Sequence, residues 1–204
     1  MVRVICWDIS KLGQNDYDAL YRAASPERRR RADRYQRRED ALRCVAAEAL
    51  VRFILGTDRF TVETDPFGKP RIAEYPDFHY NLSHSGNWVV IARGDGPVGV
   101  DVERHSPDTD WASIARHFFS LHEQQMLERA EDPCRRFYEI WTGKESYLKY
   151  YGTGLRYDLQ SFSVDRLEEG LHIHTRQLPG GYSLSLCTKE NAYSLELLDG
   201  QRLR

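Results

Sequence analysis

Two carboxylates lie two residues apart near the middle of the chain, in the run Gly99-Val100-Asp101-Val102-Glu103. The alternation of valine with acid, following the turn residues Gly94-Asp95-Gly96-Pro97, predicts a β-strand entered from a tight turn. Successive side chains of a strand point to opposite faces, so we expect Asp101 and Glu103 to share one face. Two such acids repel each other unless a cation lies between them, and a hard divalent metal ion prefers oxygen ligands. A solvated polar face is the simpler interpretation of this pair taken alone.

A strongly basic segment lies between Glu27 and Arg43, with eight arginines against four acids in a chain of net charge −2. Guanidinium groups bind phosphate in a bidentate manner, which makes the segment a candidate phosphate site. A surface helix whose arginines pair with acids at i,i+4 spacing is an equally good interpretation.

Two loops carry residues suited to an anionic ligand. In Phe67-Gly68-Lys69-Pro70, glycine and proline predict a turn from which the lysine projects, although an ordinary exposed lysine has the same pattern. The stretch 78–86 predicts a strand that ends in a loop of small residues, hydroxyls and backbone N–H groups. Ser83 and His84 are adjacent there, and neighbouring side chains rarely face each other, so they do not indicate a hydrolase triad.

A further acid and base lie on a predicted helix that begins at Pro133 and ends at Gly152. Glu145 lies four residues from both Trp141 and Lys149, which places the three side chains on or beside one face. A routine i,i+4 ion pair explains this spacing equally well.

The elements that must position these residues alternate between strands and helices, an α+β pattern. A strand is predicted at 2–9 and a polar loop after it, and then Ser25-Pro26 begins one long helix or two in series that end at Gly56. Further strands are predicted at 60–63 and 88–93, the latter forming a hairpin with 99–103. Helices are predicted at 111–119 and after Ser120, where Glu123 completes a capping box, and the stretch 160–200 alternates like strands, including Ser161-Phe162-Ser163-Val164.

Composition narrows the classes of function. The 204 residues suffice for one domain or two small ones, and the slightly negative net charge gives no indication of nucleic acid or an anionic membrane as partner. No window approaches 18 uninterrupted apolar residues and no leader pattern begins the chain, so we expect a cytoplasmic protein that does not span a membrane. Scattered cysteines and the pair His172 and His174, without a third ligand, are interpreted as structural.

Five segments in a fixed order resemble one family, the 4′-phosphopantetheinyl transferases of the broad-specificity type that activates surfactin synthetase. The matching segments are Phe67-Gly68-Lys69-Pro70, Asn81-Leu82-Ser83-His84-Ser85, Gly99-Val100-Asp101-Val102-Glu103, Phe118-Phe119-Ser120 with Glu123, and Trp141-Thr142-Gly143-Lys144-Glu145-Ser146-Tyr147-Leu148-Lys149. The last reproduces the helix pattern W-x-x-K-E-x-x-x-K of the family.

The resemblance implies transfer of 4′-phosphopantetheine from coenzyme A to a serine of an apo acyl or peptidyl carrier protein, with release of adenosine 3′,5′-bisphosphate, in secondary metabolite biosynthesis. It also implies a monomer of two similar α/β halves in a pseudo-twofold arrangement, residues 1–98 and 99–204, with the active site in the cleft between them.

The resemblance further implies roles for individual residues. Asp101, Glu103 and Glu145 would bind Mg²⁺, with Mn²⁺ as an alternative ion, and Lys149 and His84 would contact the pyrophosphate. Glu145 would take the serine proton through a water relay, with Glu123 as a further water-linked acid. Coenzyme A would be bound by a larger set, namely Arg28, Arg31, Arg43, Cys44, Phe67, Gly68, Lys69, Pro70, Ser83, His84 and Lys149.

This chain departs from the family pattern in two places. Cys44 stands where a hydroxyl residue is expected, and arginines replace lysines at 28 and 31, which keeps the charge and adds bidentate reach. Two alternatives remain open on the residues alone. They are a Mg²⁺-dependent phosphodiesterase or nuclease that uses the same acids, and a non-catalytic module that binds nucleic acid through the arginine-rich helix.

Overall fold

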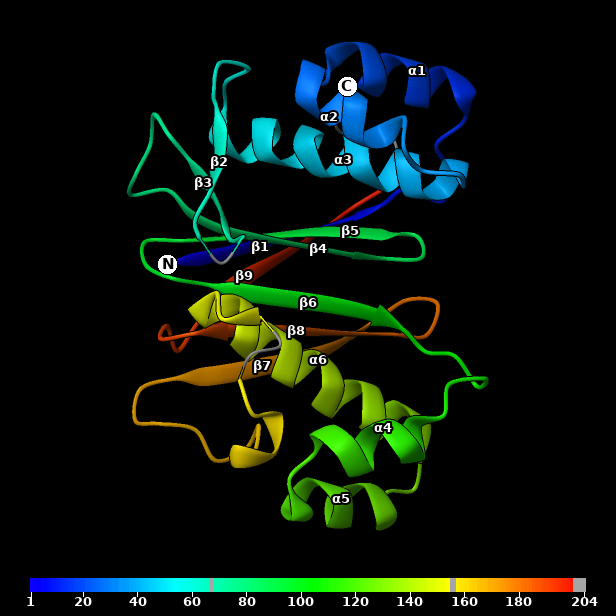
Figure 1. Cartoon of the computed structure of the whole chain (residues 1–204), viewed down its shortest axis with the longest axis vertical. Helices are drawn as coiled ribbons and strands as arrows, with labels where there is room; N and C mark the ends of the chain where they lie inside the picture. The colour runs from blue at the N-terminus through cyan, green and yellow to red at the C-terminus, as the bar shows by residue number, and fades with distance from the viewer. Residues whose placement is uncertain (67, 155–156, 200–204) are drawn as a thin grey trace.

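The computed structural model describes residues 1–66, 68–154 and 157–199. Helices flank two stacked sheets, so the predicted α+β class is confirmed (Figure 1). The elements in chain order are β1 (Val2–Asp8), α1 (Gln14–Ala23), α2 (Pro26–Ala32), α3 (Arg38–Leu55), β2 (Val62–Thr64), β3 (Pro70–Ile72), β4 (His79–Ser85), β5 (Trp88–Gly94), β6 (Gly99–Arg104), α4 (Trp111–Phe118), α5 (Leu121–Glu128), α6 (Pro133–Tyr151), the 3-10 turn η2 (Leu159–Ser161), β7 (His172–Leu178), β8 (Tyr182–Thr188) and β9 (Tyr193–Leu198).

The larger sheet has the strand order β4-β5-β1-β9, and a second sheet has the order β6-β8-β7. The predicted hairpin between residues 88–93 and 99–103 is therefore wrong, because β5 and β6 lie in different sheets. Val100 and Val102 are fully buried among side chains of the larger sheet, so β6 packs against its face instead of extending it. The short β2 and β3 pair only with each other among the described residues and form an arm (Figure 1).

Four layers follow from the burial pattern. One face of the larger sheet, including Ile5 and Ile91, packs against α3, with α1 and α2 outside it. The opposite face, including Val4 and Val90, packs against β6, β8 and β7. Helix α6 covers the outer face of this second sheet, where Leu148 packs with residues such as Cys187. Figure 1 shows these layers from α1 at the top to α5 at the bottom.

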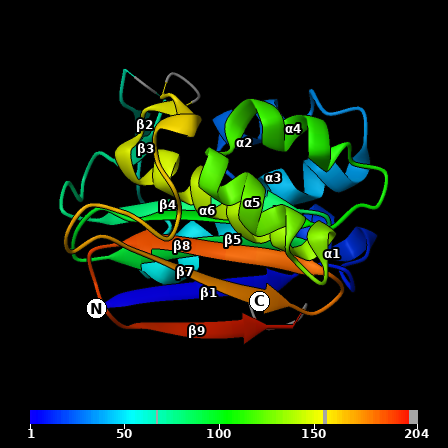
Figure 2. The same cartoon turned by 90° about the horizontal axis from the view of Figure 1, so that it is seen from below.

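The last strand returns to the first sheet. β9 pairs in parallel with β1, from Val2 opposite Tyr193 to Trp7 opposite Leu198, and the two strands lie together in Figure 2. A division of the chain at residues 98 and 99 thus separates the two sheets except for β9.

Side chains of β4 cover the edge of β6 that β8 leaves open. Backbone N–H groups of β6 would otherwise be buried without acceptors, which is costly. The hydrogen bonds run from Val100 N to Asn81 Oδ1 (2.9 Å), from Val102 N to Ser83 Oγ (3.3 Å) and from Arg104 N to Ser85 Oγ (3.1 Å). The polar side chains of β4 therefore set the register of one sheet against the other.

The helix boundaries follow the predicted signals at most positions. The region from Ser25 to Gly56 forms two helices, α2 and α3, and both Gly56 and Gly152 end helices with positive φ. The segment predicted as a polar loop contains α1, whose Tyr17, Leu20 and Tyr21 pack on the core at helical spacing. The strand predicted at 161–164 does not form. Ser161 ends the 3-10 turn η2, and Ser163 forms an isolated β-bridge with Arg166. No helix of the described residues is long and apolar enough to cross a membrane.

Candidate active site

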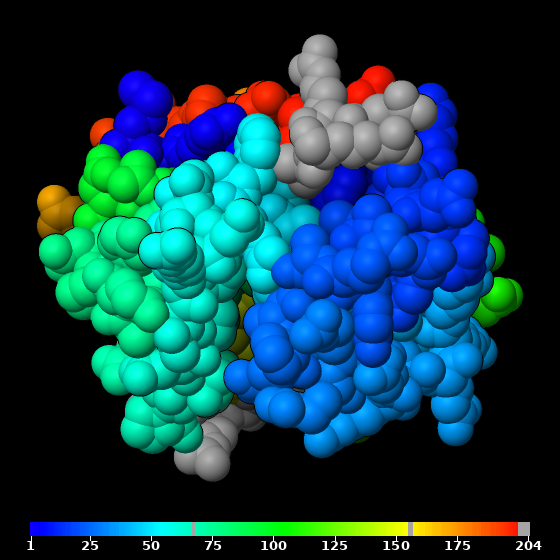
Figure 3. All heavy atoms as spheres, turned by 90° about the horizontal axis from the view of Figure 1, so that it is seen from above, coloured from blue at the N-terminus to red at the C-terminus, as the bar shows by residue number. Residues whose placement is uncertain are grey.

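A cleft of about 1380 Å³ lies between α2 and α3, the β2–β3 arm, and the junction of β4, β6 and α6. Figure 3 shows the surface hollowed between α2 in blue and the arm in cyan. Residues from both sheets, from the arm and from the helices line it, including Arg28, Arg31, Cys44, Gly68, Pro70, Ser83, His84, Asp101, Glu103, Glu145 and Lys149. Most of the predicted site residues are thus brought to one cavity.

Three carboxylates and one lysine form the acidic end of this cleft. Asp101 and Glu103 project from β6 toward α6, as the alternation of the strand predicted, and Glu145 and Lys149 lie one turn apart on α6. Lys149 Nζ donates to Asp101 Oδ1 at 2.6 Å and to Ser83 Oγ at 3.0 Å. Lys149 therefore forms an ion pair with Asp101 on β6, although Glu145 lies one turn away on its own helix.

Mutual repulsion and burial alter the proton affinities of these acids. Burial, and then the neighbouring Asp101 carboxylate, raise the pKa of Glu103 to about 7. The same two causes, in the same order, raise the pKa of Glu145, while Lys149 opposes them. Asp101 is 3% exposed, and its Oδ2 is buried without a hydrogen-bond partner among the described residues. The cluster therefore carries more negative charge than Lys149 neutralises.

Serines of β4 orient two of the carboxylates. Ser83 Oγ donates to Asp101 Oδ1 at 2.8 Å, and Ser85 Oγ donates to Glu103 Oε2 at 2.8 Å. Each hydroxyl oxygen also accepts a hydrogen bond from a backbone N–H of β6. Each serine hydroxyl therefore acts as a donor and as an acceptor at the same time. The β4–β6 junction thus both joins the two sheets and fixes the acids.

The donor set fits a hard divalent cation. Buried carboxylates that raise one another's pKa, and one buried oxygen without a partner, are the surroundings in which such an ion is stabilising. In the described part of the chain no three His, Cys, Asp or Glu side chains are grouped as a metal site, and Lys149 lies against Asp101. Carboxylates are the ligands that Mg²⁺ prefers, but among the described residues they are not already arranged around a metal position.

His84 lines the same cleft from β4, and its side chain is accessible from the cavity. Loss of hydration lowers its pKa, and the cations Arg43, Lys149 and Arg31 lower it further. The ring is therefore neutral at pH 7 and can donate or accept one hydrogen bond to a bound phosphate.

The arginine-rich segment forms the opposite end of the cleft. Arg28 and Arg31 line it from α2, and Cys44 lines it from α3. Cys44 Sγ lies 4.0 Å from Arg28 Nη1, so the cysteine contacts one of the predicted phosphate-binding arginines. Arg28 also pairs with Glu48 of α3, which lies 20 residues away, so this ion pair is not the i,i+4 pair of a surface helix.

Two predicted coenzyme A ligands point elsewhere. Arg43 Nη1 donates to Gly86 O at 2.7 Å and Nη2 pairs with Asp40, beside a separate smaller hollow. Lys69 Nζ donates to Tyr150 O at 2.6 Å, and burial lowers its pKa. This lysine caps the carboxyl end of α6, where carbonyl groups lack helical partners, and so joins the β2–β3 arm to α6. Phe67 lies outside the described residues.

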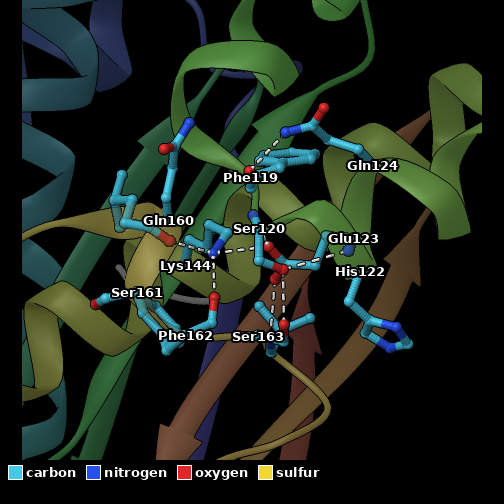
Figure 4. A network of polar contacts seen from close by, with 12 residues as sticks. Phe119, Ser120, His122, Glu123, Gln124, Lys144, Gln160, Ser161, Phe162 and Ser163 are labelled. Atoms are coloured by element: carbon cyan, nitrogen blue, oxygen red, sulfur yellow. Dashed lines mark hydrogen bonds and ion pairs between the residues drawn. The ribbon is translucent and has the colours of Figure 1, made fainter.

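The structure does not bring Glu123 to the cleft. It is fully buried, with Oε2 2.8 Å from Lys144 Nζ and from Ser120 N, and Oε1 2.9 Å from Val164 N (Figure 4). Lys144 also donates to the carbonyls of Leu159 and Phe162. The capping-box pattern predicted the contact with Ser120, but the proposed water-linked role does not fit a carboxylate saturated by these donors.

Lining residues that were not predicted as ligands include Glu48, Arg52, Tyr80 and Trp141. The sequence spacing predicted that Trp141 shares a helix face with Glu145. Its ring packs edge to face against Phe118, with the ring centroids 5.7 Å apart. Glu48 carried a usable signal, since it is an acid on the otherwise apolar buried face of α3.

The α+β fold thus builds one cleft that has arginines at one end and three carboxylates with a lysine at the other. The model of the 4′-phosphopantetheinyl transferase superfamily matches residues 97–197. The chain is 33% identical to the 4′-phosphopantetheinyl transferase Sfp of Bacillus subtilis (strain 168) over 198 residues, 86% of this chain and 87% of the relative. It is 35% identical to psf-1 of Bacillus pumilus over 202 residues, 89% and 86% of the two chains. The chain therefore belongs to the 4′-phosphopantetheinyl transferase superfamily, and it is an Sfp-like member.

Proposed function

We propose that this enzyme transfers the 4′-phosphopantetheine group of coenzyme A to a serine of an apo carrier protein within the cleft described above. The observation that carries the proposal is one continuous cavity with Arg28 and Arg31 at one end and Asp101, Glu103, Glu145 and Lys149 at the other. Coenzyme A has a ribose 3′-phosphate and a pyrophosphate, which need separate positively charged environments. The family membership supports the same reaction.

The arginine end would bind the nucleotide. Arg28 and Arg31 would contact the 3′-phosphate, and Gly68, Pro70 and Cys44 would line the nucleotide pocket. Lys149 and His84 would contact the pyrophosphate, where the lysine stabilises the charge that develops on the leaving group.

The acidic end would hold Mg²⁺ through Asp101, Glu103 and Glu145. When bound, the ion would neutralise charge on the pyrophosphate. The Ser83 and Ser85 hydroxyls would keep two of these acids in place by the hydrogen bonds given above.

Transfer joins the serine oxygen of the carrier to the phosphorus nearest the pantetheine, and breaks the bond from that phosphorus to the bridging oxygen. Adenosine 3′,5′-bisphosphate leaves with the electron pair of that bond. Glu145 would accept the serine proton through an intervening water and not directly, because a bound cation lowers the proton affinity of the carboxylate that holds it.

The carrier would approach at the α4–α5 corner. Phe118 is 37% exposed and Leu121 is 78% exposed there, and Phe118 contacts Trp141 in the cleft wall. Apolar contacts of this kind are typical at the centre of protein interfaces. We propose a monomer that acts in a reducing compartment such as the cytoplasm, since one chain completes the cleft and its four cysteines are unpaired thiols.

The comparisons give no support to the nuclease or to the nucleic-acid-binding module. Release of adenosine 3′,5′-bisphosphate from coenzyme A, followed by chromatography, separates the alternatives. We expect release only when an apo carrier is present, and none when its acceptor serine is replaced by alanine. Equal release without any carrier would indicate a hydrolase instead.

A further inference from the structure

Glu48 is a buried carboxylate in the wall of the cleft, and the transfer chemistry proposed above gives it no role. It lies on α3, is 3% exposed, and lines the cavity together with Ser25, Arg28 and Arg52. A charge so deeply buried is costly unless its oxygens accept hydrogen bonds from polar or charged donors. Its surroundings therefore need an explanation.

Both oxygens of Glu48 are saturated by donors from two helices. Oε1 accepts from Ser25 N at 2.7 Å and from Arg52 Nη2 at 2.6 Å. Oε2 accepts from Ser25 Oγ at 2.8 Å and from Arg28 Nε at 3.3 Å. One carboxylate thus ties together the first turn of α2 and the side chain of Arg52.

These contacts fix Arg28 at two points. Ser25 caps α2 by accepting from Arg28 N at 3.2 Å, so Glu48 holds the cap that holds the backbone of Arg28. Glu48 also engages the Nε atom of the same arginine. Among the described residues, Arg28 Nη1 makes only a long contact of 4.0 Å to Cys44 Sγ, so the terminal nitrogens can still donate to a ligand. An arginine ordered in advance loses less side-chain entropy when it binds.

We propose that Glu48 is a positioning residue that presents Arg28 to the 3′-phosphate, and that it thereby helps the enzyme distinguish coenzyme A from 3′-dephospho-coenzyme A. This inference rests on the proposed function, in which Arg28 binds that phosphate. Removing the negative charge alone would strengthen the attraction for phosphate. Glutamine, however, would turn an NH₂ group toward the arginine or serine donors and leave buried donors unpaired, which releases Arg28.

Equilibrium binding to the full chain tests the proposal without catalysis. Adenosine 3′,5′-bisphosphate and adenosine 5′-monophosphate are titrated calorimetrically against the wild type and the variants Glu48→Gln, Glu48→Asp and Glu63→Gln. Glu63 is a matched control, because it is an exposed acid on the arm that pairs with Arg71 outside the cleft lining. We expect Glu48→Gln to weaken bisphosphate binding about tenfold and monophosphate binding less than about twofold. Glu48→Asp keeps the charge and should restore most of the preference, while Glu63→Gln should match the wild type.

A double-mutant cycle separates positioning from general stability. In the Arg28→Ala background, Glu48→Gln should weaken bisphosphate binding by less than about twofold more, since its target is gone. Equal losses for both nucleotides, or an unchanged preference in Glu48→Gln, would overturn the proposal. Should Glu48→Gln fail to fold, Ser25→Ala decides, because it removes the hydroxyl that links Glu48 to the backbone of Arg28. An unchanged preference for the bisphosphate in that variant would overturn the proposal. If the wild type itself does not prefer the bisphosphate, the 3′-phosphate site of the proposed function fails as well.

Discussion

Lys149 on α6 and Asp101 on β6 form an ion pair of 2.6 Å that joins the two walls of the acidic end of the cleft. The lysine contacts the same carboxylate oxygen, Oδ1, that accepts the hydroxyl of Ser83, whereas Oδ2 has no partner among the described residues. Helix α6 and strand β6 are therefore held together by a lysine that, in the proposed function, would also contact the pyrophosphate of the substrate.

Replacing this lysine by a neutral side chain of similar length should affect turnover more than substrate affinity. Lys149→Met removes the charge that stabilises the leaving group, so we expect kcat to fall about a hundredfold. Lys189→Met, which changes an exposed lysine, serves as the control. Steady-state kinetics with coenzyme A and an apo carrier measure the effect, and an unaltered kcat in Lys149→Met would contradict the role.

The stability of the metal-free protein should depend on pH through Glu103. Its pKa is about 7 in the folded state against 4.5 for the reference group, so folding is favoured by its protonation. The wild type should lose stability relative to Glu103→Gln as pH rises from about 4.5 to about 7, and the difference should stay constant above that range. The Tm difference between the two proteins in the presence of a chelator measures this, because titration of the histidines is common to both. A Tm difference that does not change with pH over this interval would show that the pKa of Glu103 is not raised.

Addition of Mg²⁺ should reverse that instability. Binding to the folded state alone raises stability as RT ln(1 + [L]/Kd), about 2.7 kcal/mol at a hundredfold excess over Kd. We expect Mg²⁺ to raise the Tm of the wild type at pH 7.5 and to leave Asp101→Asn unchanged. Activity should also be lost with a chelator and restored by Mg²⁺. An equal Tm increase in both proteins would place the ion elsewhere.

The buried pair of Glu123 and Lys144 should govern stability and leave chemistry largely unaffected. Removal of one partner leaves the other charge buried and unpaired, so Glu123→Gln should lower the free energy of unfolding by about 3–5 kcal/mol. Urea denaturation measures that loss. The kcat of the folded fraction should remain within about threefold of the wild type. A large fall in kcat with unchanged stability would return Glu123 to the catalytic residues.

The sequence predicted the local features of this site well. The alternation of Val100 and Asp101 correctly separated the core face of β6 from its acidic face, because a strand leaves only two directions for a side chain. Helix boundaries at Ser25, Gly56, Pro133 and Gly152 also followed from capping chemistry.

Long-range relationships could not be predicted in the same way. The separation of β5 and β6 depends on how two apolar faces stack, and adjacency in the chain favoured the wrong hairpin. Lys69 and Glu123 have side chains long enough to reach several partners, so only the packed structure shows that they bind Tyr150 O and Lys144. The link between Glu48 and α2 was overlooked because Arg28 and Ser25 lie 20 and 23 residues away from it in the chain.

The central claim is most directly tested by the intact mass of an apo carrier protein incubated with the purified enzyme, coenzyme A and Mg²⁺. We predict a gain equal to one phosphopantetheine group, lost when the acceptor serine of the carrier is replaced by alanine and when the enzyme carries Asp101→Ala. Several unrelated apo carriers that show no mass gain, with coenzyme A and metal in excess, would contradict the assignment.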